Sequence, residues 1–173
     1  MKCTQCGTDS VQRRATVRNP YHYTFSGLRN VFLCGISVRV CPSCKSESPI
    51  IPAVGELHRA IANALAKKPF PLSGEEIRFL RKNIGIPAKK LAAVLGIAPE
   101  TLSRIENGKV EGGLRAGLEH LVRLLARSAS ASESLREAVL EVADLLERQT
   151  GTSGRVQPIR LKPDNEGGWK AAA

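Results

Sequence analysis

Apolar and polar residues alternate with a period of two in parts of the first 50 residues. Tyr21, Tyr23 and Phe25 alternate with polar neighbours in YHYTF, and the run ISVRV (36–40) repeats the pattern. A period of two is typical of strands with one buried face. We therefore predict a β-rich module over residues 1–50, in which those three aromatic residues share one face.

After Pro52 the apolar period becomes helical. Val54, Leu57, Ile61 and Leu65 fall on one helical face. The helix runs into the proline-bracketed segment KKPFP (67–71), which favours a boundary between two modules. We predict a helix and linker over residues 51–71.

A series of short helices follows over residues 72–127. Ser73 precedes two acidic residues and is predicted to be the N-cap of the first helix. Pro87 and Pro99 are predicted to lie at the start of two further helices. A fourth helix carries its apolar face on Leu114, Leu118, Leu121, Val122 and Leu125. The fold class is therefore α+β, with a small β-module followed by an all-α domain.

The C-terminal part is predicted to contain one more helix. SASAS (128–132) is interpreted as a loop or a helix breaker. Leu135, Val139, Val142 and Leu146 then mark an acidic amphipathic helix, so residues 128–149 form a separate element. Residues 150–173 are rich in glycine, proline and polar groups, which predicts a disordered tail.

The basic charge is concentrated in the first two thirds of the chain. Among 173 residues, 26 are Lys or Arg and 16 are Asp or Glu, which gives a net charge of +10. Residues 1–70 have a surplus of seven basic residues and 71–127 a surplus of four, whereas 128–173 have one more acidic than basic residue. A polyanion such as nucleic acid is therefore an expected partner of the first two modules. No signal peptide or membrane span is predicted, so we expect a cytoplasmic protein.

Two CxxC pairs indicate a metal site. Cys3 and Cys6 form the first pair, Cys41 and Cys44 the second. Two such turns complete a tetrahedral set of four thiolates, which leaves no open position for water and is typical of one structural Zn²⁺ in a zinc ribbon. A redox CxxC is the alternative, but its βαβ context is absent. Cys34, in the apolar run NVFLCG, is expected to be a buried thiol.

The stretch APETLSRIENGK (98–109) follows a glycine-containing turn, and its polar residues form an outward stripe. This arrangement is typical of the recognition helix of a helix-turn-helix. Arg104 has the reach to bind guanine, whereas Glu100 either stabilises the helix dipole or accepts from cytosine. The predicted DNA-binding residues, which include expected phosphate contacts, are Glu100, Thr101, Ser103, Arg104, Asn107, Lys109, Lys89 and Lys90. Glu106 is expected to be a structural partner of a nearby basic group.

The segment AAVLGIAPETLSRIENGK resembles the helix-turn-helix of the Xre/Cro-repressor superfamily, whose pattern it matches at Leu95, Gly96, Leu102, Ser103, Glu106 and Gly108. It departs from that pattern at Ala98, where a Ser or Thr cap is usual. With MKCTQCG and VRVCPSC in front of it, residues 1–127 are similar to the MqsA (YgiT-type) antitoxins of toxin–antitoxin pairs. In that family an Asn and an Arg four residues apart contact bases. These positions fall on Glu100 and Arg104, so only the arginine carries over.

The resemblance implies a homodimer that binds a palindromic double-stranded DNA operator, represses its own operon and neutralises an mRNA-cleaving ribonuclease toxin through the zinc ribbon. A stand-alone zinc-ribbon/helix-turn-helix transcription regulator without a toxin partner is the alternative. An enzyme is not expected, because the four thiolates would saturate the metal and the three histidines are not clustered.

Overall fold

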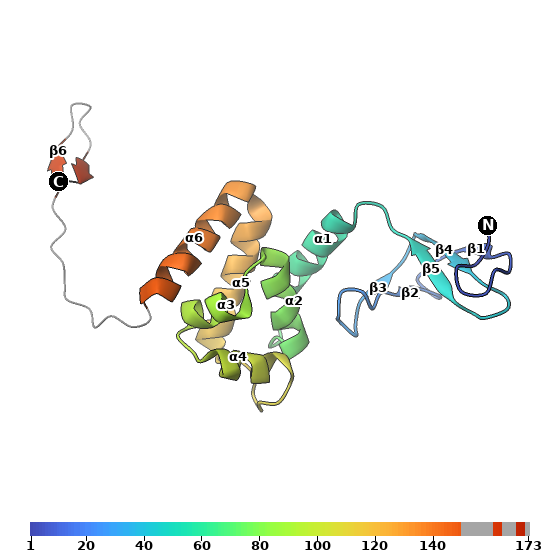
Figure 1. The fold of residues 1–173 in the computed structure, drawn as a ribbon, viewed down its shortest axis with the longest axis horizontal. Helices are drawn as coiled ribbons and strands as arrows, with labels where there is room; N and C mark the ends of the chain where they lie inside the picture. The colour runs from blue at the N-terminus through green and yellow to red at the C-terminus, as the bar shows by residue number, and fades with distance from the viewer. Residues whose placement is uncertain (150–160, 164–168, 172–173) are drawn as a thin grey trace.

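The computed structural model describes residues 1–149, 161–163 and 169–171. Five short strands come first: β1 (Val11–Arg14), β2 (Tyr21–His22), β3 (Phe32–Leu33), β4 (Ser37–Val40) and β5 (Glu47–Ile50). Six helices follow: α1 (Val54–Lys67), α2 (Gly74–Ile84), α3 (Ala88–Leu95), α4 (Pro99–Glu106), α5 (Ala116–Ala131) and α6 (Glu133–Gln149). The strands β6 (Leu161–Pro163) and β7 (Trp169–Ala171) pair with each other. The α+β fold class is confirmed, with strands β1 to β5 at one end and the six helices beyond them (Figure 1).

The N-terminal strands form two small antiparallel sheets. One sheet has the order β1-β4-β5 and the other pairs β2 with β3. Val38 is fully buried in the centre of β4, with Ala15, Tyr21 and Tyr23 around it. Phe25, which was predicted to share this face, is 75% exposed. The prediction fails because the chain leaves the strand for a turn, in which Gly27 has φ 75° and its amide donates to the carbonyl of Thr24.

The strand module docks on the helices through the segment between β2 and β3. Leu28 is buried in the helical core, and the exposed Arg29 pairs with Glu75 at 2.9 Å. The Tyr23 hydroxyl lies 2.9 Å from Nε2 of His58 on α1, whose ring packs edge-on against Phe79. The two parts therefore share side chains across their junction.

The helical core is aliphatic. Its fully buried large side chains are Ile77, Leu80, Ile84, Ile86, Leu91, Leu102 and Val122. The predicted capping of α2 is confirmed as a capping box, because Ser73 Oγ accepts from the Glu76 amide and Glu76 accepts from the Ser73 amide. The capping box sets where α2 starts, and Gly74, its first residue, lies against the backbone of Ile105 and Glu106 at the end of α4.

Helix α1 packs with the helices that follow it. Ala62 and Leu65 belong to the same buried cluster as α2 to α5, and α1 lies against both α2 and α5. The KKPFP segment therefore connects two parts of one core, although the domain limits themselves remain a prediction.

The segment SASAS, which was predicted to be a loop or a helix breaker, is mostly helical and breaks the helix at Ser132. Helix α5 continues through Ala131, and Ser132 alone separates it from α6. Ser and Ala tolerate helical geometry where tertiary packing supports it, and Ala129 packs on the core. Helix α6 returns along α5 and α3. The prediction of a disordered tail falls mainly on residues outside the described ranges.

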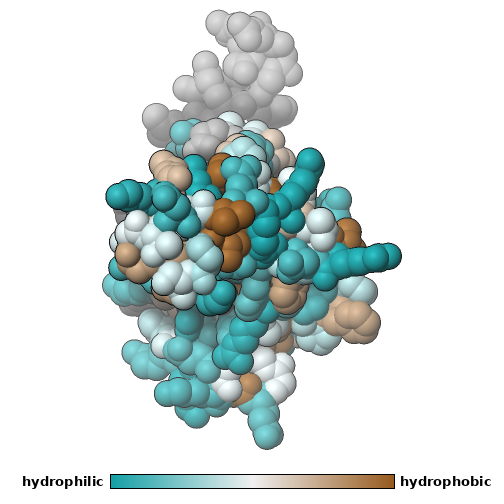
Figure 2. Space-filling model, turned by 90° about the vertical axis from the view of Figure 1, so that its right-hand side faces the viewer, coloured by the Kyte–Doolittle hydropathy of each residue, from teal (hydrophilic) through white to brown (hydrophobic). Residues whose placement is uncertain are grey.

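No helix in the described part of the chain is long and apolar enough to cross a membrane. Seen from the end where the strands lie, the surface is mostly hydrophilic with separate hydrophobic spots (Figure 2).

Candidate metal site and DNA interface

The four predicted cysteine ligands converge. Their Sγ atoms all lie within 4.8 Å of one another, with Cys3 and Cys44 at 3.7 Å and Cys6 and Cys41 at 3.4 Å. Tetrahedral ligands at a Zn–S distance of about 2.3 Å would be separated by about 3.8 Å. The spacing of the four sulfur atoms therefore fits one metal ion.

Two backbone turns of the same form present these thiols. In the first turn the Cys3 amide donates to the carbonyl of Thr8, and the Gly7 amide donates to the carbonyl of Cys3. In the second turn the Cys41 amide donates to Ser46, and the Lys45 amide donates to Cys41. Gly7 and Lys45 hold the same left-handed position, at φ 73° and 59°. Backbone hydrogen bonds thus fix the conformation of both CxxC turns, and no large hydrophobic core is needed to orient the thiols.

The surroundings favour the thiolate form at Cys3 and Cys6 but not at Cys41. Although a backbone hydrogen bond with Cys44 lowers the pKa of Cys41, burial and the hydrogen bond with Cys6 raise it to about 11. A hydrogen bond with the Ser46 hydroxyl, at 3.2 Å from Cys3 Sγ, is the main reason that the pKa of Cys3 is lowered to about 6. Hydrogen bonds with Thr8 lower the pKa of Cys6. Because a thiolate is the form that binds metal, Cys3 and Cys6 are prepared for a metal ion, and binding at Cys41 would release the proton of its thiol.

Cys34 lies apart from this cluster, and the expectation of a buried thiol is wrong. The residue is exposed. Strand β3 ends at Leu33, and Gly35 turns the chain with φ 80°. Cys34 therefore lies just after the strand, in a turn, where its thiol faces solvent.

Helices α3 and α4 are joined by a tight turn. Gly96 ends α3 with φ 63°, and the amides of Gly96 and Ile97 donate to the carbonyls of Ala93 and Ala92. Pro99 then begins α4 after Ala98, which has no side chain that could cap the helix. This turn sets the angle between the two helices.

Helix α4 is fixed to α2 on one face and open on the other. Leu102 is fully buried and Ile105 is 5% exposed. Glu106, at 4% exposure, accepts from Arg81 Nε at 2.6 Å and from Arg81 Nη2 at 2.9 Å, and Arg78 lies 3.4 Å away. The prediction that Glu106 is a structural partner is confirmed. The arginines that hold it were not identified from the sequence.

The outward face of α4 carries the predicted base-reading residues. Glu100, Thr101, Ser103 and Arg104 are all exposed. Arg104 has no ion-pair partner within the described part of the chain, and its side chain is therefore available to a ligand.

Asn107 is exposed but already bonded. Its Nδ2 donates to the carbonyl of Ser103 at 2.7 Å, and its Oδ1 accepts from Arg78 at 2.7 Å. The residue thus ends α4 and links it to α2. A role in reading bases would have to use the second N–H or the second lone pair of this amide, because one of each is already bonded.

The predicted phosphate contacts lie in different surroundings. Lys109 is exposed just after α4, and Lys89 is exposed at the start of α3. Lys90 is half-buried and forms an ion pair with Asp144 of α6. This pair could not be predicted, because no pattern in the sequence indicates that α6 lies against α3.

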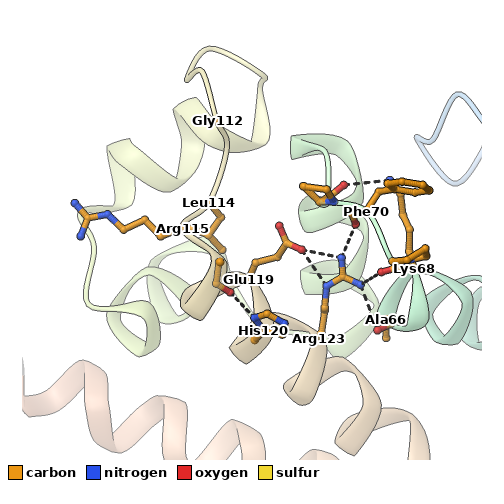
Figure 3. Close-up of a pocket in the computed structure, with 12 residues that line it drawn as sticks. Ala66, Lys68, Phe70, Gly112, Leu114, Arg115, Glu119, His120 and Arg123 are labelled. Atoms are coloured by element: carbon orange, nitrogen blue, oxygen red, sulfur yellow. Dashed lines mark hydrogen bonds and ion pairs between the residues drawn. The ribbon is translucent and has the colours of Figure 1, made fainter.

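A separate cavity of about 600 Å³ lies between the start of α5 and the segment after α1 (Figure 3). Arg123 points across it, pairs with Glu119 at 2.7 Å, and donates to the carbonyls of Lys68 and Phe70. Glu119 also accepts from the Leu72 amide at 3.1 Å. These groups satisfy one another and hold the chain between α1 and α2, so their role is structural.

Comparison with known proteins assigns the helical segment. The family model of the helix-turn-helix matches residues 77–111, which span most of α2, all of α3 and α4, and the loop that follows. Residues 77–111 are therefore similar to the helix-turn-helix of the Xre type. No curated protein and no solved structure matches the chain.

The helix-turn-helix is a DNA-binding module of transcription regulators, and proteins of this type are typically not enzymes. The Xre/Cro part of the resemblance is therefore confirmed. The resemblance to MqsA antitoxins, the identity of the metal and the dimer remain predictions.

Proposed function

We propose that the protein is a sequence-specific transcription repressor that places α4 in the DNA major groove. The observation that carries this proposal is the division of α4 into a buried face, Leu102 and Ile105, and an exposed face with Glu100, Ser103 and Arg104. A recognition helix needs both faces, because it must be held rigidly while its outer side chains reach base edges.

Within this proposal Arg104 is the main base-reading residue. Its guanidinium can donate to O6 and N7 of one guanine, and such a pair gives about 1–3 kcal/mol of discrimination. Thr101 and Ser103 offer hydroxyls to phosphates or base edges. Lys89 and Lys109 contribute phosphate contacts, which supply affinity rather than specificity.

The proposed metal is one structural Zn²⁺ held by Cys3, Cys6, Cys41 and Cys44. Support comes from the all-sulfur donor set and from the tetrahedral spacing. The ion would tie the turn before β1 to the turn after β4. The buried apolar cluster of the strand module is small, so metal binding would supply much of its folding free energy.

The proposed biological role is that of an antitoxin, acting as a homodimer on a palindromic operator and neutralising a ribonuclease toxin. The resemblance of residues 1–127 to MqsA proteins supports it. The strand module also exposes large apolar side chains, among them Val11 at 64%, Val17 at 85% and Phe32 at 56%, which a protein partner could cover.

The DNA-binding part is tested by selecting bound duplexes from random DNA and measuring affinity for the selected site. Arg104→Ala is expected to lose sequence preference while nonspecific binding at low salt persists. Arg127→Ala, which removes an exposed cation from α5, is the matched control and should keep the preference. An Arg104→Ala protein that selects the same site with the same affinity would refute the assignment of α4.

The antitoxin part is tested separately. The product of the adjoining gene is expressed alone and together with this protein, and its ribonuclease activity is measured. Restored growth and a stable complex would support the antitoxin role. An adjoining gene without ribonuclease activity would favour the stand-alone regulator.

A further inference from the structure

Arg78 of α2 reaches the outward face of α4, the helix that the proposed function places in the major groove. Its Nη2 donates to Asn107 Oδ1 at 2.7 Å, and its Nε lies 3.4 Å from Glu106 Oε2. The same guanidinium therefore touches a buried residue of α4 and an exposed residue that follows it. The shorter of the two contacts is the one with the exposed residue.

The buried carboxylate of Glu106 does not depend on Arg78. The Arg81 side chain is 12% exposed and donates to both oxygens of Glu106, at 2.6 and 2.9 Å. The Arg78 side chain is 35% exposed, and its distance to the carboxylate is 3.4 Å. Strong charge-assisted hydrogen bonds are short, so Arg81 supplies the bonds that hold Glu106 in place. The strong hydrogen bond of Arg78 is the one with Asn107.

The hydrogen bonds around Asn107 fix the orientation of its amide group. A guanidinium can only donate, so the amide atom that faces Arg78 must be the oxygen. A backbone carbonyl can only accept, so the amide atom that faces the Ser103 carbonyl, at 2.7 Å, must be the nitrogen. The same nitrogen lies 3.5 Å from Ser103 Oγ. A flipped amide would lose the bonds to Arg78 and to the Ser103 carbonyl together.

Asn107 belongs to the outward face of α4. It follows Ser103 by four positions and Arg104 by three, so the three side chains leave the backbone on the same side of the helix. All three residues are exposed. One N–H and one lone pair of the Asn107 amide remain beyond the bonds to Arg78 and Ser103. The fixed amide can therefore donate to the edge of a base or accept from it.

We propose that Arg78 is a positioning residue for DNA reading, which holds the Asn107 amide in the one orientation in which it meets a base edge of the operator. This inference rests on the proposed function, in which α4 lies in the major groove. Arg78 acts through Asn107 and does not itself contact DNA. An amide that is already fixed loses less rotational freedom on binding, and it cannot flip to exchange its donor and acceptor for a different base. Its orientation thereby contributes to sequence preference.

The test is a double-mutant cycle on duplex binding by the full-length protein. Affinity is measured for the selected operator and for duplexes in which each base pair is changed singly. Asn107→Ala is expected to lose about tenfold of discrimination at the base pair that the amide reads. Arg78→Met should lose discrimination at the same base pair and at no other. The double variant should lose no more than Asn107→Ala alone, because Arg78 then has no amide to position.

Two variants serve as controls for the loss of Arg78. Arg78→Lys keeps a charged donor at this position and should retain most of the discrimination. Arg59→Met removes an exposed arginine of α1, which pairs with Glu56 on its own helix, and it should bind every duplex as the unmodified protein does. Thermal unfolding followed by circular dichroism checks that each variant is folded. Arg78→Met is expected to fold, because Arg81 still holds Glu106.

Three results would overturn the proposal. The first is unchanged discrimination at every base pair in Asn107→Ala. The second is a double variant that loses more than Asn107→Ala, because Arg78 would then act on its own. The third is an equal loss of affinity for all duplexes in Arg78→Met, with a salt dependence weaker by about one phosphate contact, which would make Arg78 a phosphate ligand. Arg104→Ala is measured on the same duplexes. If it loses sequence preference while Asn107→Ala does not, this inference fails and the assignment of α4 stands.

Discussion

Replacing Gly74 with alanine tests the contact that orients α4. Gly74 is the first residue of α2, and a Cβ atom built there would lie 2.1 Å from the carbonyl oxygen of Ile105 and 3.0 Å from the Glu106 backbone. Both neighbours are backbone atoms, so no side chain can rotate out of the way. Either α2 or the end of α4 must move by about 1 Å to restore ordinary contact.

The expected magnitude follows from two opposing effects. Overpacking a site that must shift backbone costs about 1–3 kcal/mol. Alanine in place of glycine returns at most about 1 kcal/mol through helix propensity, and less at a first helical position. We therefore expect Gly74→Ala to lower the free energy of unfolding by about 1–2 kcal/mol. The melting temperature should fall by several degrees.

Gly117→Ala is the matched control. Gly117 lies in the first turn of α5, has no atom within 4 Å of its built Cβ, and also avoids the left-handed region. This variant should be as stable as the unmodified protein or more stable. Thermal unfolding followed by circular dichroism compares the two. Equal stability of Gly74→Ala and Gly117→Ala would refute the close contact between α2 and α4.

Three further changes give separate predictions. Cys41→Ser should abolish stoichiometric metal binding and unfold the strand module while the helical signal remains, as checked by metal analysis and circular dichroism. Full metal content in this variant would contradict the four-thiolate site. The control is Cys34→Ser, which replaces an exposed cysteine outside the cluster. Glu106→Gln should destabilise the protein by about 3 kcal/mol in chemical denaturation, because it leaves Arg81 buried without its counter-charge, and an unchanged midpoint would count against that pair. Asp144→Asn should free Lys90 to bind a DNA phosphate, so the logarithm of the affinity for duplex DNA should fall more steeply with the logarithm of the salt concentration, by about one phosphate contact. Glu141→Gln should leave this slope unchanged. An equal slope for Asp144→Asn and the unmodified protein would mean that α6 does not mask Lys90.

The helical part could be predicted well because its signals are local. Ser73, Pro87, Pro99 and Gly96 act at helix ends through backbone geometry, and each lies at the helix end where it was expected. The two CxxC turns were equally clear, because their ligand spacing depends on only a few residues. These features do not require knowledge of distant contacts.

The features that were missed depend on contacts between distant segments. Arg81 lies 25 positions before Glu106, and Arg123 lies more than 50 positions after the carbonyls it binds. No period in the sequence connects such partners. Phe25 and Cys34 were misplaced for a different reason: strands of two residues end before the alternation of apolar residues does.

The most direct test of the central claim replaces one acceptor atom in the DNA. Operator duplexes are prepared in which 7-deazaguanine replaces a single guanine, so that the N7 acceptor is lost from the major groove. At the guanine read by Arg104, the unmodified protein should lose about 1–3 kcal/mol of binding free energy, whereas Arg104→Ala should bind both duplexes equally. The loss of binding free energy is compared between the two proteins at every guanine of the operator. If Arg104→Ala loses as much as the unmodified protein at each of them, Arg104 does not read a base.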